Sequence, residues 1–316
     1  MFKFAAERNR EITLRFSYFF ITFAAMGKNN IVYHIIAIIT VLIWGGTFIN
    51  SKILLQHGLE PHEIFVLRFL FAYICIWFIS PHRLFGDTIK DELLFVLLGI
   101  TGGSLYFITE NHAVQIDYVN NVSFIVCTAP LLTTLLALKF LKSVKATRNL
   151  VLGAIAATLG VALVVFNGHF VLKLNPLGDA LALSAALCWA VYSILMKFVA
   201  NRYSSIFITR KVFFYGLITV LPYFLLRPWQ FPLSRFTHPA VWGNLLFLGT
   251  IASFACFELW SLVIKKIGAI PVSNYVYLNP ISTVIVSALV LSEPMTPLAY
   301  LGSILILLGV YLSNKK

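Results

Sequence analysis

The chain has 316 residues, of which 59% are hydrophobic, 15% aromatic and only 11% charged. Soluble domains carry about 25% charged residues, so this composition, with a mean hydropathy of +0.88, excludes a soluble enzyme. A net charge of +12 would indicate nucleic-acid binding in a soluble protein, but here Lys and Arg cluster between apolar runs. That distribution is typical of a protein that crosses a membrane several times, and we expect no nucleic-acid partner.

Ten apolar segments follow one another along the chain, and Pro, Gly or charged residues mark nearly every break. A bilayer-spanning helix needs roughly 20 apolar residues. In chain order the segments are residues 32–50, 62–80, 93–112, 119–138, 150–167, 178–196, 208–226, 241–263, 272–291 and 298–313. Because the loops are short, we predict an all-α membrane protein with ten transmembrane helices and no inserted soluble domain.

The distribution of basic residues predicts the orientation of these segments. If the first span starts in the cytoplasm, the outer loops contain only Lys52, Lys173, Arg227 and Arg235, whereas the inner loops are rich in Lys and Arg. Positive residues are retained on the cytoplasmic side, so we predict that both termini are cytoplasmic. The short loops suit the cytoplasmic (inner) membrane of a bacterium.

The first 30 residues differ from the rest of the chain. Basic residues precede a short apolar run, 16–26, which resembles a signal peptide but is too short to span a membrane. A chain that began at Met26 would look like an ordinary start of a multi-pass protein. We interpret residues 1–30 as an N-terminal extension, either a mis-assigned start or a disordered tail, with an interfacial helix as the alternative. We assign this extension no function.

The two halves of the chain resemble each other. Trp44 and Lys52 stand eight residues apart, and Trp189 and Lys197 repeat this spacing. Further matches at similar offsets are Arg68 with Arg210, Ser123 with Ser273, Pro130 with Pro280, Thr133 with Thr283, and Gly153 and Gly160 with Gly302 and Gly309. We therefore predict two five-helix repeats, residues 31–168 and 176–313.

An odd number of helices in each repeat has a topological consequence. The second repeat enters the membrane from the opposite side, so the two repeats are inverted relative to each other. This architecture is typical of transporters that alternate access around a site near the midplane, between the repeats.

Three stretches carry a family likeness. They are residues 43–48 (Ile-Trp-Gly-Gly-Thr-Phe), the start of the second span with Arg68, and residues 277–310, with Asn279-Pro280 and Ser292-Glu293-Pro294. The chain resembles the drug/metabolite transporter superfamily, and within it the ten-span EamA-type permeases, over about residues 31–313. The resemblance implies a cavity surrounded by spans 1, 3, 4, 6, 8 and 9. The family usually has a Glu-containing turn after the fourth span, whereas residues 142–145 contain no acid.

Two glutamates are candidates for proton coupling, because polar groups at bilayer depth usually face a cavity or a partner. Glu110 shares one face of the third span with Tyr106. It is either a proton or substrate-amine site in the cavity or an interfacial carboxylate that is exposed to water or paired with Lys52. Glu258 lies near the middle of the eighth span, 148 residues later. It exchanges protons, or it is a neutral side chain bonded to a neighbouring helix.

The other cavity candidates lie on spans 1, 4, 6 and 9. Trp44 and Trp189 form either an adaptable aromatic wall for an amphipathic solute or simple packing. Pro130 and Pro280 each leave the carbonyl four residues earlier without its helix donor, at a hinge or at a plain packing kink. The complete set of predicted cavity residues is Trp44, Thr47, Asn50, Tyr106, Glu110, Ser123, Thr128, Trp189, Tyr192, Ser193, Glu258, Asn274, Tyr277 and Asn279.

Two further sets of matched residues have structural interpretations. Arg68 and Arg210 lie near the starts of spans 2 and 7, where we expect them to extend toward the headgroups. A gating salt bridge between Arg68 and Glu63 is the alternative. The matched glycines favour close helix packing, either within the fold or across a dimer, so the chain is expected to be a monomer or a homodimer.

The sequence contains no motif for catalysis or nucleotide hydrolysis, and its His and Cys residues are scattered without metal-ligand spacing. We expect no enzyme activity, cofactor or metal. The predicted function is secondary active transport of small organic metabolites across the lipid bilayer, by resemblance the export of amino acids or similar solutes, in exchange for protons. The alternatives are a nucleotide-sugar or sugar-phosphate carrier, an intramembrane lipid-modifying enzyme and a passive channel. A phosphate-bearing substrate would require buried Lys or Arg in the cavity.

Overall fold

The structure is a computed structural model that describes residues 31–79, 84–141, 147–166, 175–291 and 297–315. The described residues form helices and no strands. Within them, seven helices are long and apolar enough to cross a membrane, and two shorter apolar helices cover Arg148–Val164 and Tyr300–Asn314. The all-helical prediction is confirmed, whereas the count of ten spans stays a prediction. The N-terminal extension and the turn at 142–145 lie outside the described residues.

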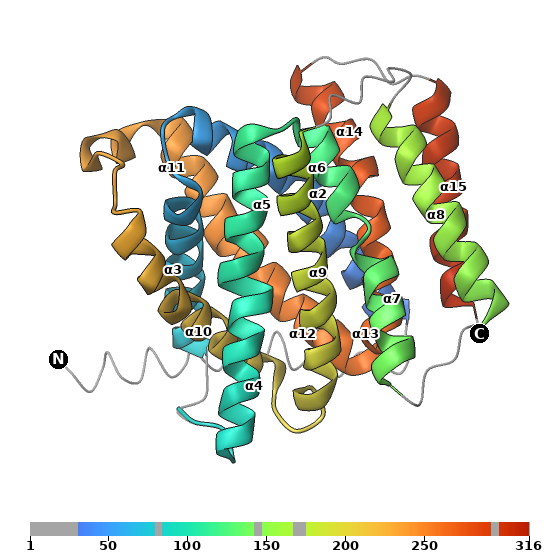
Figure 1. Cartoon of the computed structure of the whole chain (residues 1–316), viewed down its shortest axis with the longest axis horizontal. Coiled ribbons are helices and arrows are strands. Elements are labelled where there is room, and N and C mark those ends of the chain that lie inside the picture. Colours follow the sequence, from blue (N-terminus) through green and yellow to red (C-terminus); the bar gives the residue numbers. More distant parts are fainter. Residues whose placement is uncertain (1–30, 80–83, 142–146, 167–174, 292–296, 316) are drawn as a thin grey trace.

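The first half of the chain begins with the long helix α2 and ends with α8 (Figure 1). Its elements are α2 (Ile31–Gln56), α3 (Pro61–Ile79), α4 (Ile89–Gly99), η1 (Ile100–Ser104), α5 (Leu105–Ile116), α6 (Val119–Val126), α7 (Ala129–Phe140) and α8 (Arg148–Phe166). The Thr88 side chain caps α4 by accepting a hydrogen bond from the backbone N–H of Asp91, which satisfies one free donor of the first turn.

The second half begins at α9, where Asn175 is the N-cap and Pro176 the first helical residue, a common start signal. Its elements are α9 (Pro176–Val199), α10 (Ser205–Leu226), η2 (Leu233–Thr237), α11 (Pro239–Leu246), η3 (Phe247–Ala255), α12 (Cys256–Ile267), α13 (Ala269–Ser273), η4 (Asn274–Leu278), α14 (Asn279–Leu291) and α15 (Pro297–Asn314). Gly268, with φ of +94°, ends α12 in a conformation that glycine adopts at little cost.

The third and eighth segments each contain a π-helical stretch. The α-helical hydrogen bonds give way to π-type bonds at η1, between α4 and α5, and at η3, between α11 and α12. Such stretches are rare and often lie at functional sites, because they widen the helix and redirect its backbone carbonyls. Of the two, η3 contacts residues of the pocket described below, through Ala252 and Ser253.

The fourth and ninth segments are interrupted just before their prolines. The fourth breaks at Cys127 and Thr128, between α6 and α7, and the ninth contains the 3₁₀ stretch η4 before α14. Because Pro130 and Pro280 lack an N–H, the preceding turn cannot complete its regular bonding. The interruptions agree with the predicted loss of helix donors, while a hinge motion at these prolines stays a prediction.

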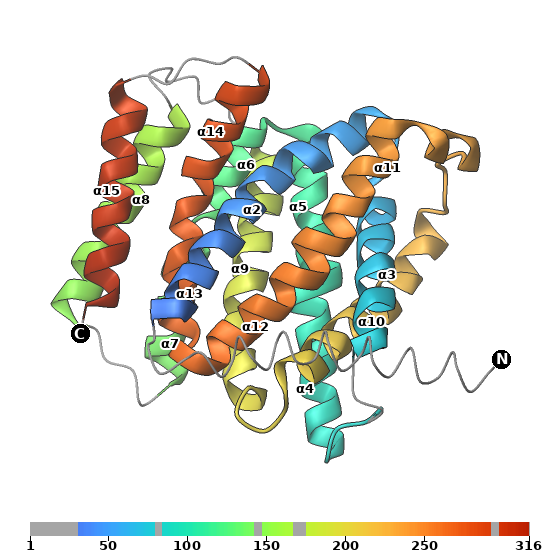
Figure 2. The ribbon, with the colours of Figure 1, turned by 180° about the vertical axis from the view of Figure 1, so that it is seen from behind.

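Helices α8 and α15 lie side by side at one edge of the bundle, whereas α3 and α10 lie toward the opposite edge (Figures 1 and 2). Gly160 and Gly302 face each other across the α8–α15 contact, and a Cβ atom on either would lie 2.6 Å from the carbonyl oxygen of the other. The predicted close packing at these glycines therefore occurs within the fold.

Helices α2 and α12 cross the middle of the bundle obliquely (Figure 2). At Gly45, α2 approaches α14 so closely that a Cβ would lie 2.6 Å from the carbonyl oxygen of Asn279. The Thr283 hydroxyl donates to the Gly45 carbonyl at 2.8 Å, which ties the two helices together. This crossing brings Trp44 of the first half close to Asn279 of the second.

Candidate functional site

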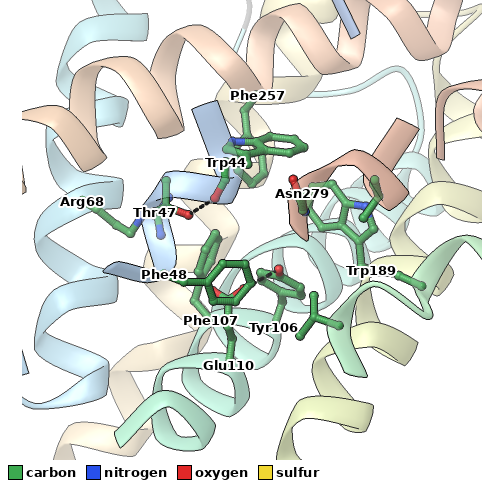
Figure 3. A pocket seen from close by; sticks show the side chains of 13 residues that line it. Trp44, Thr47, Phe48, Arg68, Tyr106, Phe107, Glu110, Trp189, Phe257 and Asn279 are labelled. Atoms are coloured by element: carbon green, nitrogen blue, oxygen red, sulfur yellow. Dashed lines mark hydrogen bonds between the residues drawn. The ribbon is translucent and has the colours of Figure 1, made fainter. Parts of the chain in front are cut away.

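A pocket lies at the centre of the bundle, where helices of both halves meet (Figure 3). The first half contributes α2, α3, α5, α6 and α7, and the second contributes α9, α12, η4 and α14. The lining residues are Trp44, Thr47, Phe48, Arg68, Tyr106, Phe107, Glu110, Val126, Ala129, Trp189, Phe257, Val276 and Asn279. The cavity volume is about 30 Å³, enough for a water molecule or two. A larger solute therefore fits only when the lining side chains move.

Aromatic rings form most of the pocket wall. The Trp44 and Trp189 rings meet edge to face, with centroids 5.2 Å apart, and the Tyr106 ring lies 5.3 Å from that of Trp189. The indole N–H of Trp44 donates to the carbonyl of Ala252, in η3, at 2.8 Å. The π-helical stretch thus supplies the acceptor that holds Trp44. The two matched tryptophans are thus in contact, while their role as a wall for a solute stays a prediction.

Glu110 is buried in the pocket wall and is held by the residue one turn before it. The Tyr106 hydroxyl donates to Oε1 of Glu110 at 2.6 Å, within α5. The alternative pairing with Lys52 is wrong, because Lys52 donates instead to the carbonyl of Val114 at 2.7 Å. Glu110 thus presents a carboxyl group to the pocket while its orientation is fixed by Tyr106.

Arg68 lies in the pocket and not at the membrane surface, so its interpretation as a headgroup-seeking residue is wrong. Only 1% of the residue is exposed. Its Nε donates to the Ser253 hydroxyl, in η3, at 2.9 Å, and its guanidinium lies 4.1 Å from the centroid of the Phe107 ring. The alternative salt bridge with Glu63 is also absent, since Glu63 accepts from the backbone N–H groups of Gln230 and Phe231.

Two polar side-chain atoms of the described pocket residues are buried without a hydrogen-bond partner. They are Oδ1 of Asn279, an acceptor, and Nε1 of Trp189, a donor. Buried polar atoms are normally paired, so such atoms call for an explanation. Both residues line the pocket, where a solute or a water molecule could supply the missing partner.

The structure brings six of the predicted cavity residues together in this pocket: Trp44, Thr47, Tyr106, Glu110, Trp189 and Asn279. The remaining candidates do not line it: Asn50, Ser123, Thr128, Tyr192, Ser193, Glu258, Asn274 and Tyr277. Of these, Asn50 donates to the side chain of Asn244 at 2.5 Å, and Asn274 donates to Asn314 at 3.1 Å. Sequence reasoning missed Arg68 and the apolar residues Phe48, Phe107, Val126, Ala129, Phe257 and Val276.

Glu258 is buried but faces a different part of the bundle. The Ser205 hydroxyl, at the start of α10, donates to Oε1 of Glu258 at 2.5 Å. Beside this contact, the Thr209 hydroxyl donates to Ser261 at 3.0 Å. This arrangement corresponds to the alternative in which Glu258 bonds a neighbouring helix, and a role in proton exchange stays a prediction.

An ionic cluster ties the two halves together at the end of the bundle where α4 and α10 begin. Glu92 forms a salt bridge with Lys211 at 2.8 Å and also accepts from the Tyr215 hydroxyl. Its neighbour Asp91 pairs with Arg202 at 2.5 Å and accepts from the Tyr203 hydroxyl. We call Asp91, Glu92, Arg202, Tyr203, Lys211 and Tyr215 the α4 latch. It joins α4, in the first half, to residues after α9 and in α10.

A known protein family matches both halves of the chain. The model of the EamA-like transporter family matches the chain twice, at residues 31–166 and 176–315. The chain therefore belongs to the EamA-like transporter family and is a multi-pass membrane protein.

Several curated proteins are similar over most of their length. An uncharacterized transporter of Archaeoglobus fulgidus is 27% identical over 90% of this chain and 97% of its own. A probable amino-acid metabolite efflux pump of Escherichia coli is 24% identical over 88% of this chain and 93% of its own. A probable terminal-alkyne amino-acid exporter of Streptantibioticus cattleyicolor is 23% identical, covering 88% and 92%. One crystal structure superposes with a TM-score of 0.72 at 16% identity, covering 90% of this chain and 98% of that one, which shows the shared fold.

Proposed function

We propose that this protein is a secondary active transporter that exports amino acids or similar amphipathic metabolites across the cytoplasmic membrane of a bacterium. The observation that carries the proposal is the central pocket, which is lined by both halves of a chain whose family is one of transporters. Its mixed lining of aromatic rings and a few polar groups is typical of sites for small organic molecules.

The proposed topology is ten spans arranged as two inverted five-helix repeats, with both termini in the cytoplasm. The double match of the family model supports the repeat, and so do the π-helical stretches in the third and eighth segments. In such an architecture the pocket opens alternately to the two sides while the repeats rock against each other. The narrow pocket and the closed α4 latch fit a state in which the solute path is shut.

The names of two relatives support the substrate class. Proteins described as a probable amino-acid metabolite efflux pump and a probable terminal-alkyne amino-acid exporter match nearly the whole chain at 23–24% identity. The sugar-phosphate alternative gains one observation, the buried Arg68, but Glu110 lines the same pocket. A carboxylate there would repel a phosphate dianion, so we favour the amino-acid class.

Transport by the purified full chain in proteoliposomes tests the proposal. A pooled metabolite library is offered with and without a pH gradient, and mass spectrometry identifies the solutes that accumulate. Accumulation of amino acids only with the gradient is the expected result. If the vesicles take up no solute of the library, the proposed function is wrong.

Proton coupling is tested separately with Glu258→Gln and Glu110→Gln. We expect at least one of the two variants to equilibrate its solute without accumulating it, while remaining folded. If both variants accumulate solute as the unmodified protein does, neither glutamate carries the coupling proton.

A further inference from the structure

We propose that the pocket recognises a zwitterion, with Arg68 binding the carboxylate and Glu110 the ammonium group of an amino acid that has an apolar side chain. This inference rests on the proposed function and deepens it by assigning a charged group of the solute to each residue. It starts from two buried, oppositely charged side chains that line one pocket.

The two charges lie in the same cavity without forming an ion pair. Arg68 is 1% exposed and Glu110 is 7% exposed. Arg68 and Glu110 form no salt bridge within 4.0 Å in the part of the chain that the structure describes, unlike Asp91 and Glu92, which pair with Arg202 and Lys211. Burial of a charge without an oppositely charged contact is costly. A solute with its own separated charges, inserted between the two side chains, would compensate both at once.

The environment of Arg68 leaves it ready to bind an anion. A guanidinium has five N–H donors in a planar fork that matches a carboxylate. In the described chain, its hydrogen bond is the one from Nε to the Ser253 hydroxyl, at 2.9 Å. The ring of Phe107, 4.1 Å away, covers one face of the fork. These contacts fix the orientation of the guanidinium while its terminal N–H groups stay available.

In this proposal Glu110 and Oδ1 of Asn279 together bind the ammonium group. One oxygen of Glu110 accepts from Tyr106 at 2.6 Å, which leaves the rest of the carboxylate for another donor. Oδ1 of Asn279 is a buried acceptor without a partner in the same pocket. An ammonium group carries three donors, so it can satisfy both acceptors.

The rest of the lining selects the other parts of the solute. Trp44, Phe48 and Phe257 provide an apolar wall for a hydrophobic side chain (Figure 3). Arg68 is the single Lys or Arg among the described lining residues, and Glu110 balances its charge. The pocket is therefore neutral overall and dipolar, which disfavours both a phosphate dianion and a simple cation.

The experiment compares each amino acid with the two molecules that lack one of its charges. The full chain is reconstituted in proteoliposomes and offered leucine, 3-methylbutylamine and 4-methylpentanoate, and likewise phenylalanine, phenethylamine and 3-phenylpropanoate. We expect transport of at least one of the two amino acids, and competition by its amine or acid weaker by about 10-fold or more.

Two variants assign the charges, and a matched control excludes a general effect of losing arginine. In Arg68→Gln we expect the amino acid to lose about 10- to 100-fold in apparent affinity while the amine binds as before. In Glu110→Gln we expect the carboxylic acid to keep its affinity while the amino acid loses it. Arg210→Gln is the control, because Arg210 occupies the matching position in the second half but does not line the pocket.

The outcomes separate this inference from the proposed function. If an amine or an acid alone competes as well as its amino acid, the zwitterion site is wrong while amphipathic transport stands. The zwitterion site is equally wrong if the pooled library reveals a transported solute that lacks one of the two charges. It is also wrong if Arg68→Gln and the control Arg210→Gln weaken the binding of the amino acid, the amine and the acid to the same extent. If no solute of the library is transported, the proposed function fails first. The comparison of amine, acid and amino acid on the unmodified protein decides the matter even if a variant does not fold.

Discussion

If the α4 latch holds the two halves together, neutralising Glu92 should change how often the pocket opens at that end of the bundle. Glu92 forms a salt bridge with Lys211, whose side chain is only 4% exposed, and accepts a further bond from the backbone N–H of Gly86 at 2.5 Å. These contacts connect α4 with α10, on opposite sides of the interface between the halves. Glu92→Gln keeps the size of the side chain and removes its charge.

The expected size of the effect follows from the hydrogen bond to Lys211. A hydrogen bond to a charged group is worth about 1.5–3 kcal/mol, and the buried ammonium loses its counter-charge. Because about 1.4 kcal/mol corresponds to a tenfold change in an equilibrium, the ratio of open to latched states should rise by roughly 10- to 100-fold. Lys211→Gln removes the same pair, so the double variant should add little to either single change.

Thiol labelling measures this change. Phe48→Cys is introduced into the pocket of a protein whose four native cysteines are replaced, and a membrane-impermeant maleimide is added from the side of the latch. Labelling should accelerate in Glu92→Gln and stay unchanged in the control Lys90→Gln, since Lys90 is an exposed neighbour on α4. Equal labelling rates with and without the Glu92 charge would refute the role of the latch in gating, even if thermal stability falls.

Two further predictions concern packing and the pocket wall. Gly45→Ala should lower the free energy of unfolding by about 1–3 kcal/mol, because its Cβ would lie 2.6 Å from the Asn279 carbonyl. Gly46→Ala, with nothing within 4 Å, is the control, and equal melting temperatures for the two variants would contradict the tight crossing. Tyr106→Phe removes the hydroxyl that donates to Glu110 at 2.6 Å and should weaken solute affinity about 5- to 30-fold, given about 1–2 kcal/mol for the lost bond. The control is Tyr300→Phe on α15, where the side chain is exposed; an unchanged affinity in Tyr106→Phe would show that Glu110 is positioned without it.

The position of Arg68 shows how sequence reasoning can fail at a helix end. The arginine lies near the start of the second span, which favoured an interfacial interpretation. Yet it is seven residues after Pro61, the first residue of α3, or about 10 Å along the helix axis. That depth is beyond the first turns and could have been recognised from the sequence. The apolar lining residues carried no comparable signal, because a core residue and a pocket residue have the same pattern.

The position of Glu258 has a different cause. Glu258 follows Glu110 by 148 residues, but the two π-helical stretches that precede them differ in length, with five residues in η1 and nine in η3. Phe257 lines the pocket, and Glu258 does not. Adjacent helical residues point about 100° apart, so an error of one residue moves a side chain to another face. The lengths of π-helical stretches follow from tertiary packing, so a single sequence did not reveal this shift.

The edge pair α8 and α15 has a consequence for any motion between the two halves. Gly153 on α8 and Gly309 on α15 approach so closely that a Cβ on either would lie 2.6 Å from the carbonyl oxygen of the other. Helix α8 belongs to the first half and α15 to the second. Movement of one half against the other must therefore either carry these two helices as one unit or slide them along this glycine contact.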